Sequence, residues 1–222
     1  MTLLKTRLCS FHETMKNRNT LTIGFLGLSL WLSSIPVRAS ECTPTQVQPA
    51  SETREIINQE YNLRFEIPRN YQTSSNRHDS RLVIAIRNPG DVAFEACIAE
   101  PGNSGNSRYV ATDVTVLIED LPANIVSLGD LLDYVTSRAN QNLNIEQSSV
   151  ETIQVDGQDG VLMTEEFLGT RSRFPETNRY AYILHPNGQH LIRIRAWQFG
   201  RDDVDAVDLD IQQLILSTLS FF

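Results

Sequence analysis

Residues 150–197 read VETIQVDGQDGVLMTEEFLGTRSRFPETNRYAYILHPNGQHLIRIRAW, and this stretch decides the fold. Two short segments, Asp156-Gly157 and Asn187-Gly188, supply the positive φ values that tight hairpin turns need. The runs that flank these turns are rich in Val, Ile, Leu and Tyr, and they alternate in polarity as β-strands do. In the last run, isoleucines alternate with arginines, so the two residue types point to opposite faces. The stretch therefore predicts an antiparallel meander with one buried face and one solvated face.

The N-terminus has the pattern of an export signal. Basic residues precede an uncharged apolar run, Thr20–Val37, which ends at a Val37-Arg38-Ala39 cleavage box. This pattern predicts a secretory signal peptide over residues 1–39. The run is also just long enough to cross a bilayer, so a retained membrane anchor is the alternative. No lipid anchor is expected, because Glu precedes Cys42 where a lipoprotein signal has a small residue.

Removal of the signal changes the charge of the chain. Of the 222 residues, 183 remain, and they contain 14 Arg, no Lys and 26 Asp plus Glu. This length is enough for one domain with a hydrophobic core. The net charge of −12 makes nucleic acid and anionic lipid poor partners, whereas a basic protein or a divalent cation fits better.

Two cysteines, Cys42 and Cys97, remain after cleavage. In an oxidising compartment they would form a disulfide that ties the N-terminal segment to the domain. Closure of a loop of that length stabilises a fold by about 4 kcal/mol in the chain-entropy model. Two unpaired thiols are the alternative.

The rest of the chain supplies further strands and two helices. Residues 40–58 are polar and indicate a linker before a domain over 59–222. Ser127 begins an amphipathic helix that ends near Asn140, and Asp130 completes a start that resembles a capping box. Strands are expected over 61–68, 81–87, 92–99 and 109–118, a polar loop over 72–79, and a second helix over 203–217. Strands in antiparallel order with a few amphipathic helices covering them predict an α+β layered sandwich.

These motifs, taken in order, resemble those of the PsbP-like family. Phe65-Glu66-Ile67-Pro68 followed by Asn70-Tyr71 is similar to the family's opening F-x-(Y/I)-P-x-x-(W/Y). The resemblance covers about Gln59 to Phe222. Three later motifs of the family also have counterparts in this chain. The first is the helix over 128–140, which precedes a Gly-containing turn at Thr152–Gly157. The other two are the Tyr-rich run Tyr180–Leu184 before an Asn-Gly turn, and the C-terminal Leu219-Ser220-Phe221.

The resemblance implies an α/β/α sandwich around a central antiparallel sheet, export to the thylakoid lumen or periplasm, and a role without catalysis. The best-known member is an extrinsic photosystem II subunit that helps to retain calcium and chloride at the oxygen-evolving centre. Two features depart from the photosystem members: this acidic chain has no Lys after residue 39, and it lacks the lipid anchor of the cyanobacterial form. We therefore expect an exported accessory or binding protein, peripheral to a membrane, with a photosystem II complex as partner. A general periplasmic protein of this fold is the alternative, and an enzyme is the third reading.

Candidate metal ligands lie beside the second turn. His185 and His190 flank it, and two facing imidazoles could share zinc or manganese. Local spacing supplies no third ligand, so the simpler interpretation is that both histidines are ordinary surface residues. His78, beside Asp79 in a polar loop, could be a weak metal ligand, but it too is more simply read as a surface residue. An acidic cluster suggests calcium but lacks the Gly and Glu of an EF-hand loop, so it fits an acidic first helical turn instead. Its members are Asp202, Asp203, Asp205, Asp208 and Asp210.

Arg171, Arg173, Arg193 and Arg195 are the expected partner-binding residues, able to take an acidic partner or a carboxylate. The alternative is that they pair with the abundant carboxylates of the chain itself. Glu165-Glu166 point to opposite faces of a strand and do not form a general acid/base pair. No G-x-S-x-G elbow is present, and no enzyme is expected.

Overall fold

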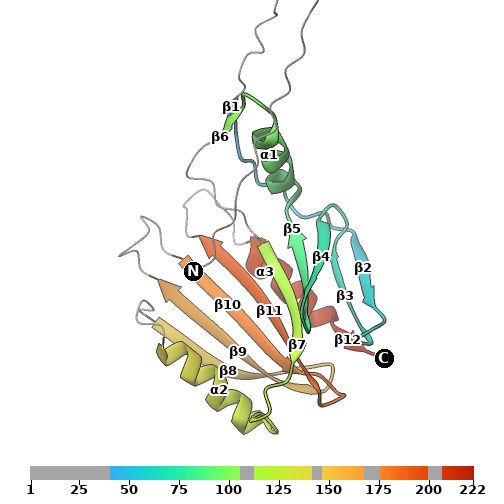
Figure 1. Ribbon diagram of the computed structural model, residues 1–222, viewed down its shortest axis with the longest axis vertical. Helices are drawn as coiled ribbons and strands as arrows, with labels where there is room; N and C mark the ends of the chain where they lie inside the picture. The colour runs from blue at the N-terminus through green and yellow to red at the C-terminus, as the bar shows by residue number, and fades with distance from the viewer. Residues whose placement is uncertain (1–40, 106–112, 142–146, 168–175, 200–206) are drawn as a thin grey trace, which may run out of the picture. The chain divides into compact units, whose positions relative to one another are not determined.

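The chain folds around a seven-stranded sheet in which every pair of neighbouring strands is antiparallel (Figure 1). The structure, a computed structural model, describes residues 41–105, 113–141, 147–167, 176–199 and 207–222. In order across the sheet, the strands are β4 (Gln72–His78), β5 (Arg81–Arg87), β7 (Asp113–Asp120), β11 (His190–Phe199), β10 (Glu176–Leu184), β9 (Gln158–Phe167) and β8 (Gln147–Val155).

The predicted meander is confirmed, and its first turn fixes the register. Asp156 and Gly157 have φ values of 49° and 74°, and Val155 pairs with Gln158, so the turn contains two residues. Two positive φ values in a two-residue turn match the right-handed twist of the flanking strands. The second turn contains Gly188 at φ 66°.

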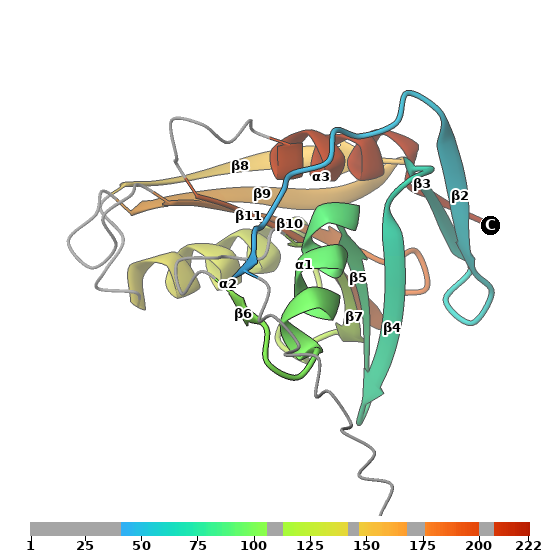
Figure 2. The ribbon, with the colours of Figure 1, turned by 90° about the horizontal axis from the view of Figure 1, so that it is seen from above.

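Helices and a smaller sheet cover the large sheet in layers. Figure 2 shows α3 on one side of the large sheet and α2 on the other. α2 (Leu128–Gln141) packs on β8 and β9, whereas α3 (Val207–Thr218) packs on β11 and on β3 of the small sheet. The small sheet has the order β12 (Ser220–Phe221), β3 (Leu63–Pro68) and β2 (Thr53–Asn58). The predicted α+β class is thus confirmed. Within the described residues, no helix is long and apolar enough to cross a membrane.

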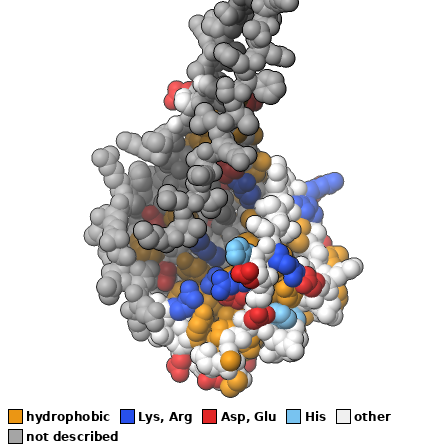
Figure 3. Space-filling model, viewed as in Figure 1, with side chains coloured by type: hydrophobic (Ala, Val, Ile, Leu, Met, Phe, Trp, Pro, Cys, Tyr) orange, Lys and Arg blue, Asp and Glu red, His pale blue; other side chains and the backbone are white. Residues whose placement is uncertain are grey.

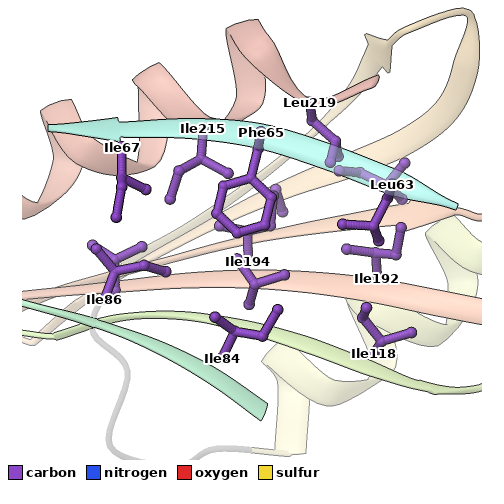
Figure 4. Close-up of a cluster of buried hydrophobic side chains, with 14 of the residues drawn as sticks. Leu63, Phe65, Ile67, Ile84, Ile86, Ile118, Ile192, Ile194, Ile215 and Leu219 are labelled. Carbon is purple, nitrogen blue, oxygen red and sulfur yellow. The ribbon is translucent and has the colours of Figure 1, made fainter. Parts of the chain in front are cut away.

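A hydrophobic core lies between the large sheet and the layer formed by β3 and α3. Figure 4 shows side chains of β3 pointing at isoleucines of the large sheet, with α3 closing the core. Its labelled members are Leu63, Phe65, Ile67, Ile84, Ile86, Ile118, Ile192, Ile194, Ile215 and Leu219.

A second hydrophobic cluster covers the other face of the sheet, beneath α2. It joins Leu131 and Val135 of α2 to Val161, Tyr182 and other side chains of the sheet. Tyr182 is only 1% exposed. The prediction of one solvated face is therefore wrong for the part of the sheet that α2 covers.

Two predicted elements are wrong for identifiable reasons. The expected strand over 92–99 is part of helix α1 (Pro89–Ala99), because Asn88-Pro89 is a helix start and not a strand end. Asn88 Oδ1 accepts a hydrogen bond from Gly90 N at 2.9 Å, and Pro89 occupies the first turn. The expected loop over 72–79 is the edge strand β4, whose side chains are all exposed. Without a buried face, β4 shows no alternation, and its polar surface protects the sheet edge from further pairing.

The segment expected as a linker belongs to the folded unit. It contains β1 (Glu41–Cys42), which pairs with β6 (Ser104–Gly105), as well as β2. Asn88 exchanges hydrogen bonds with the main chain of Val47 at 2.8 and 3.0 Å. A disulfide joins Cys42 to Cys97, so that it connects β1 to α1.

The predicted start of α2 is confirmed. Ser127 Oγ accepts a hydrogen bond from Asp130 N at 3.2 Å, and the Asp130 carboxylate accepts bonds from Ser127 Oγ and Val126 N. These bonds satisfy main-chain amides that the first helical turn leaves free. Residues 109–112 and 203–206, which the predictions place in β7 and α3, lie outside the described residues.

We expect Phe65→Ala to lower the free energy of unfolding by about 3–5 kcal/mol, because Phe65 is fully buried and the truncation leaves a cavity. The matched control is Ile57→Ala on the neighbouring strand β2, where the side chain is 56% exposed and the cost should stay below about 1 kcal/mol. Urea unfolding followed by circular dichroism measures both. Equal losses for the two variants would contradict the assigned core.

Candidate binding site on the α2 side of the sheet

Arg193 and Arg195 lie on the face of β11 that looks toward α2. Their strand neighbours Ile192 and Ile194 point into the opposite core, as the alternation predicts. Figure 3 shows basic side chains gathered beside hydrophobic ones near the centre of this face. The two expected partner-binding arginines of β11 are therefore neighbours on one face of the strand, and both are half-buried.

The register of the hairpin places aromatic rings beside these arginines. Tyr180 is opposite Arg195, and Tyr182 is opposite Arg193. The guanidinium carbon of Arg195 is 5.9 Å from the ring centroid of Tyr180 and 5.0 Å from that of Trp197. Each such cation–π contact stabilises the side chain by about 0.5–1 kcal/mol at an exposed site. Arg195 is thus held in a fixed position by two rings.

The flank of α2 completes the surface. Tyr134 packs edge-on against Tyr182 with centroids 6.5 Å apart, and Arg138 Nη1 donates a hydrogen bond to Tyr134 Oη at 3.0 Å. An open pocket of about 530 Å³ runs along this flank; its lining residues are Asn124, Asp130, Asp133, Tyr134, Ser137 and Arg138. We call the surface the arginine–aromatic face, and its members are Tyr134, Arg138, Tyr180, Tyr182, Arg193, Arg195 and Trp197.

Buried polar groups lie at the edge of the arginine–aromatic face. Glu165 of β9 pairs in register with Asn178 of β10, and they are 6% and 8% exposed. Asn178 Oδ1 and Arg195 Nε are buried and have no hydrogen-bond partner among the described residues. Burial raises the pKa of the Glu165 carboxyl, and the positive charges of Arg138 and Arg195 oppose that rise. An uncompensated polar group is costly in a protein interior, so this arrangement is unusual for a purely structural surface.

The tyrosines of the face serve as neutral groups. Burial raises the pKa of Tyr182 to about 12, and burial also raises the pKa of Tyr180. Both phenols therefore keep their protons at neutral pH. The half-buried Tyr180 can offer a ring face and a hydroxyl group to a partner, whereas the buried Tyr182 supports the face from beneath.

The predicted arginines differ in what they contact. Arg193 Nη1 lies 3.9 Å from Glu119 Oε1, and Arg81 Nε lies 3.3 Å from the other oxygen of the same carboxylate. Arg195 forms no ion pair within the described part of the chain. Pairing with the chain's own carboxylates thus holds in part for Arg193. For Arg195, the described residues provide no ion pair, although its charge acts on the Glu165 carboxyl. Arg171 and Arg173 lie outside the described residues.

Arg179, which also borders the crossing between meander strands, lies on the opposite face of β10. Its Nη2 donates to Leu209 O at 2.8 Å, and its Nε donates to Gln212 Oε1. Gln212 Nε2 in turn donates to Arg179 O and Ile194 O. Arg179 therefore fastens α3 to the sheet and takes no part in the arginine–aromatic face.

The two candidate metal-binding histidines do approach each other, with ring centroids 5.8 Å apart. His185 is buried, and both of its ring nitrogens are used: Nε2 bonds to Tyr61 O at 2.7 Å, and Nδ1 accepts from Asn187 N at 3.1 Å. Metal binding here stays a prediction, and it would require His185 to release one of these bonds. The described residues contain no group of three or more His, Cys, Asp or Glu suited to a metal.

The other acidic and histidine candidates are dispersed. His78 is exposed, and within the described residues its ring contacts the neighbouring Asp79, with 3.0 Å between Nδ1 and Oδ2. Asp208 is buried and Asp210 is exposed on α3, whereas Asp202, Asp203 and Asp205 lie outside the described residues. Glu165 and Glu166 point to opposite faces of β9, as predicted.

Sequence reasoning missed the contribution of α2 and the buried Glu165–Asn178 pair. The tight turns determine that Tyr180, Tyr182 and the arginines share a face, so that part could have been found by following the register. No local pattern indicates that Arg138, from a separate helix, approaches Glu165. That proximity comes from tertiary packing alone.

We expect Glu165→Gln to stabilise the protein relative to wild type by an amount that grows as the pH rises above the ordinary pKa of Glu, about 4.3, and levels off once folded Glu165 is ionised. The folded state holds the Glu165 proton more tightly than the unfolded state, because burial raises its pKa. Its contribution to stability is therefore greatest below the unfolded pKa and is lost as the pH rises through the folded pKa. Urea unfolding at several pH values measures the trend. Glu166→Gln, on the opposite face, is the control, and an identical trend for both variants would refute the role of burial.

Comparison with known proteins finds similar solved structures but no sequence family. No family model matches the chain, and no curated protein matches it. The solution structure of cyanobacterial PsbP (CyanoP) from Synechocystis sp. PCC 6803 is 14% identical, with a TM-score of 0.48, and covers 80% of this chain and 95% of that one. A crystal structure of a protein of unknown function from Pseudomonas aeruginosa is 13% identical, with a TM-score of 0.33. That match covers 68% of this chain and 85% of the Pseudomonas chain. At these values the likenesses carry no argument about activity or partners, and the α+β class stands on this chain's own strands and helices.

Proposed function

We propose that this protein is a non-catalytic binding module that takes an acidic protein partner at the arginine–aromatic face. The observation that carries the proposal is Arg195, which is stacked on Tyr180 and Trp197 and forms no ion pair among the described residues. Most described arginines of this acidic chain do pair with carboxylates; these are Arg64, Arg69, Arg77, Arg81, Arg87 and Arg193. Arg138 and Arg195 stay available.

The chemistry of the face suits a carboxylate. A guanidinium group presents parallel N–H donors that match the two oxygens of a carboxylate, and such charge-assisted bonds are among the strongest hydrogen bonds in proteins. Stacking on rings restricts Arg195 before a partner arrives, so less conformational entropy is lost on binding. Arginine, tyrosine and tryptophan are also the residue types that contribute most to binding energy at protein interfaces.

A binding role fits this surface better than catalysis. Glu165 and Glu166 cannot act as an acid/base pair, because Glu166 points to the other face of β9.

The resemblance of the sequence to the PsbP-like family supplies the expected setting. We propose on this basis that the protein acts in the thylakoid lumen or periplasm, beside a membrane. Its acidic partner would then be a subunit of a photosystem II complex or a protein that assembles that complex. A periplasmic protein with the same face and a different acidic partner is the alternative. Identification of the captured partner distinguishes the two.

The test is an affinity pull-down of the C-terminally tagged protein from gently solubilised membranes of its own organism. We expect wild type to recover an acidic subunit, and Arg193→Gln/Arg195→Gln to lose at least about tenfold in affinity, since two charge-assisted contacts are removed. Recovery of photosystem II subunits would support the photosystem role. Equal capture by the double variant and by wild type would sink the proposed face.

The control for net charge is Arg64→Gln/Arg69→Gln. These arginines lie at β3 and just after it, and both pair with carboxylates on the exposed surface. This variant changes the total charge by the same amount as the test variant and should bind as wild type does. Circular dichroism and thermal unfolding of all variants show whether any loss of binding reflects loss of the fold.

A further inference from the structure

Three buried polar groups meet at one end of the arginine–aromatic face. Glu165 and Asn178 are direct neighbours across β9 and β10, and Asn178 is opposite Trp197 on β11. Arg195 lies two residues before Trp197 on the same face of β11, opposite Tyr180. Asn178 is more than nine-tenths buried, yet its Oδ1 lacks a partner within the described residues, as does Arg195 Nε.

The charges at this end conflict with simple binding of an anion. Arg138 and Arg195 both act on the Glu165 carboxyl, so an ionised Glu165 competes for the two guanidinium groups that the proposed function assigns to the partner. The carboxylate of a partner would be repelled by the negative charge of ionised Glu165. Because Glu165 is buried, this repulsion is weakened less by solvent than it would be in water. A protonated Glu165 removes the repulsion, and its hydroxyl becomes a hydrogen-bond donor.

We propose that a carboxylate of the partner binds between Arg138 and Arg195, and that Glu165 takes up one proton from solvent as it binds. This inference rests on the proposed function and adds its regulation. The proton passes to a Glu165 oxygen, so that Glu165 becomes neutral while the incoming carboxylate stays ionised. The net result is that one anion and one proton bind together.

Other groups share the face of Glu165 or act on its carboxyl from each neighbouring element. α2 supplies Arg138 and β11 supplies Arg195, both positively charged. β10 supplies Asn178, which is neutral, Tyr180, whose pKa is raised by burial, and the half-exposed Glu176, which lies two positions from Asn178 on the same face. β8 supplies Ser148 in register with Glu165. Glu165 is the buried carboxyl of this set, and burial raises its pKa.

The proposal predicts a specific pH dependence. We consider the pH range in which Glu165 is ionised in the free protein and protonated in the complex. In that range, uptake of one proton makes Kd rise by up to about tenfold for each unit of pH. Below the pKa of Glu165 in the free protein, Kd becomes independent of pH. A site without proton uptake would keep a constant Kd across the whole range.

The probe is a fluorescent hexapeptide of aspartates, whose carboxyls stay ionised above about pH 5.5. Fluorescence anisotropy gives Kd for the full folded protein at constant ionic strength. We expect wild type to bind more weakly as the pH rises to about 8, and Glu165→Gln to bind with a constant Kd that is at least about tenfold tighter than wild type at the upper end. Glu166→Gln, with the adjacent carboxyl on the opposite face, should follow wild type.

The outcomes separate this inference from the proposed function. If wild type binds with a Kd that does not change with pH, or if Glu165→Gln keeps the wild-type slope, proton uptake by Glu165 is overturned and the binding face stands. If no protein binds the probe even at the lowest pH, the proposed function itself fails. Calorimetry of wild type in two buffers with different ionisation enthalpies measures the proton directly, so the question is decided even if Glu165→Gln does not fold. Uptake of up to about one proton is expected at the pH where Kd changes most steeply, and zero uptake across the whole range overturns the inference.

Discussion

The register of the β8–β11 meander is the constraint on which both the core and the binding face depend. In a strand, successive side chains point to opposite faces, so a slip of one residue would carry every arginine of β11 into the core and every isoleucine out of it. The two-residue turn at Asp156-Gly157 prevents such a slip in the first hairpin, because positive φ at both positions permits a single geometry. The same register then sets Tyr180 beside Arg195 and Glu165 beside Asn178. The backbone conformation of a short turn thus determines chemistry at the far end of the strands.

Net charge and local charge point to different partners in this chain. The excess of acidic residues repels anions at long range, but that field is screened beyond about 8–10 Å at physiological ionic strength. At contact distance a partner meets the guanidinium groups of Arg138 and Arg195 instead. The absence of Lys after residue 39 leaves arginine to provide these contacts, and arginine can stack on rings and bind a carboxylate with two parallel bonds. A surface of this kind favours specific docking over general attraction.

The sequence predicted the elements whose signals are local and missed those that depend on packing. Alternation, Asn-Gly and Asp-Gly turns, and the Ser127–Asp130 cap gave the meander and α2, because each is set by nearby residues. β4 escaped detection because an edge strand with no buried face has no alternation, and α1 was misread because Asn88-Pro89 can end a strand or start a helix. For the site, the β11 arginines were predicted, while Glu165 was considered only as one of a catalytic pair. Its closeness to Arg138 depends on where α2 settles on the sheet, which short-range patterns do not encode.

The pairing of β12 with β3 has a consequence for how the chain reaches its native state. Arg64 Nε donates to Ser220 Oγ across 156 positions, and Phe222 N donates to the carbonyl of Asn62. The main core likewise needs Ile215 and Leu219 to close over Phe65. These contacts cannot form until residues 215–222 have left the ribosome, so β3 waits for a segment that is synthesised about 150 residues later. Contacts between such distant positions slow folding, and they lengthen the time for which the nascent chain exposes its apolar strands.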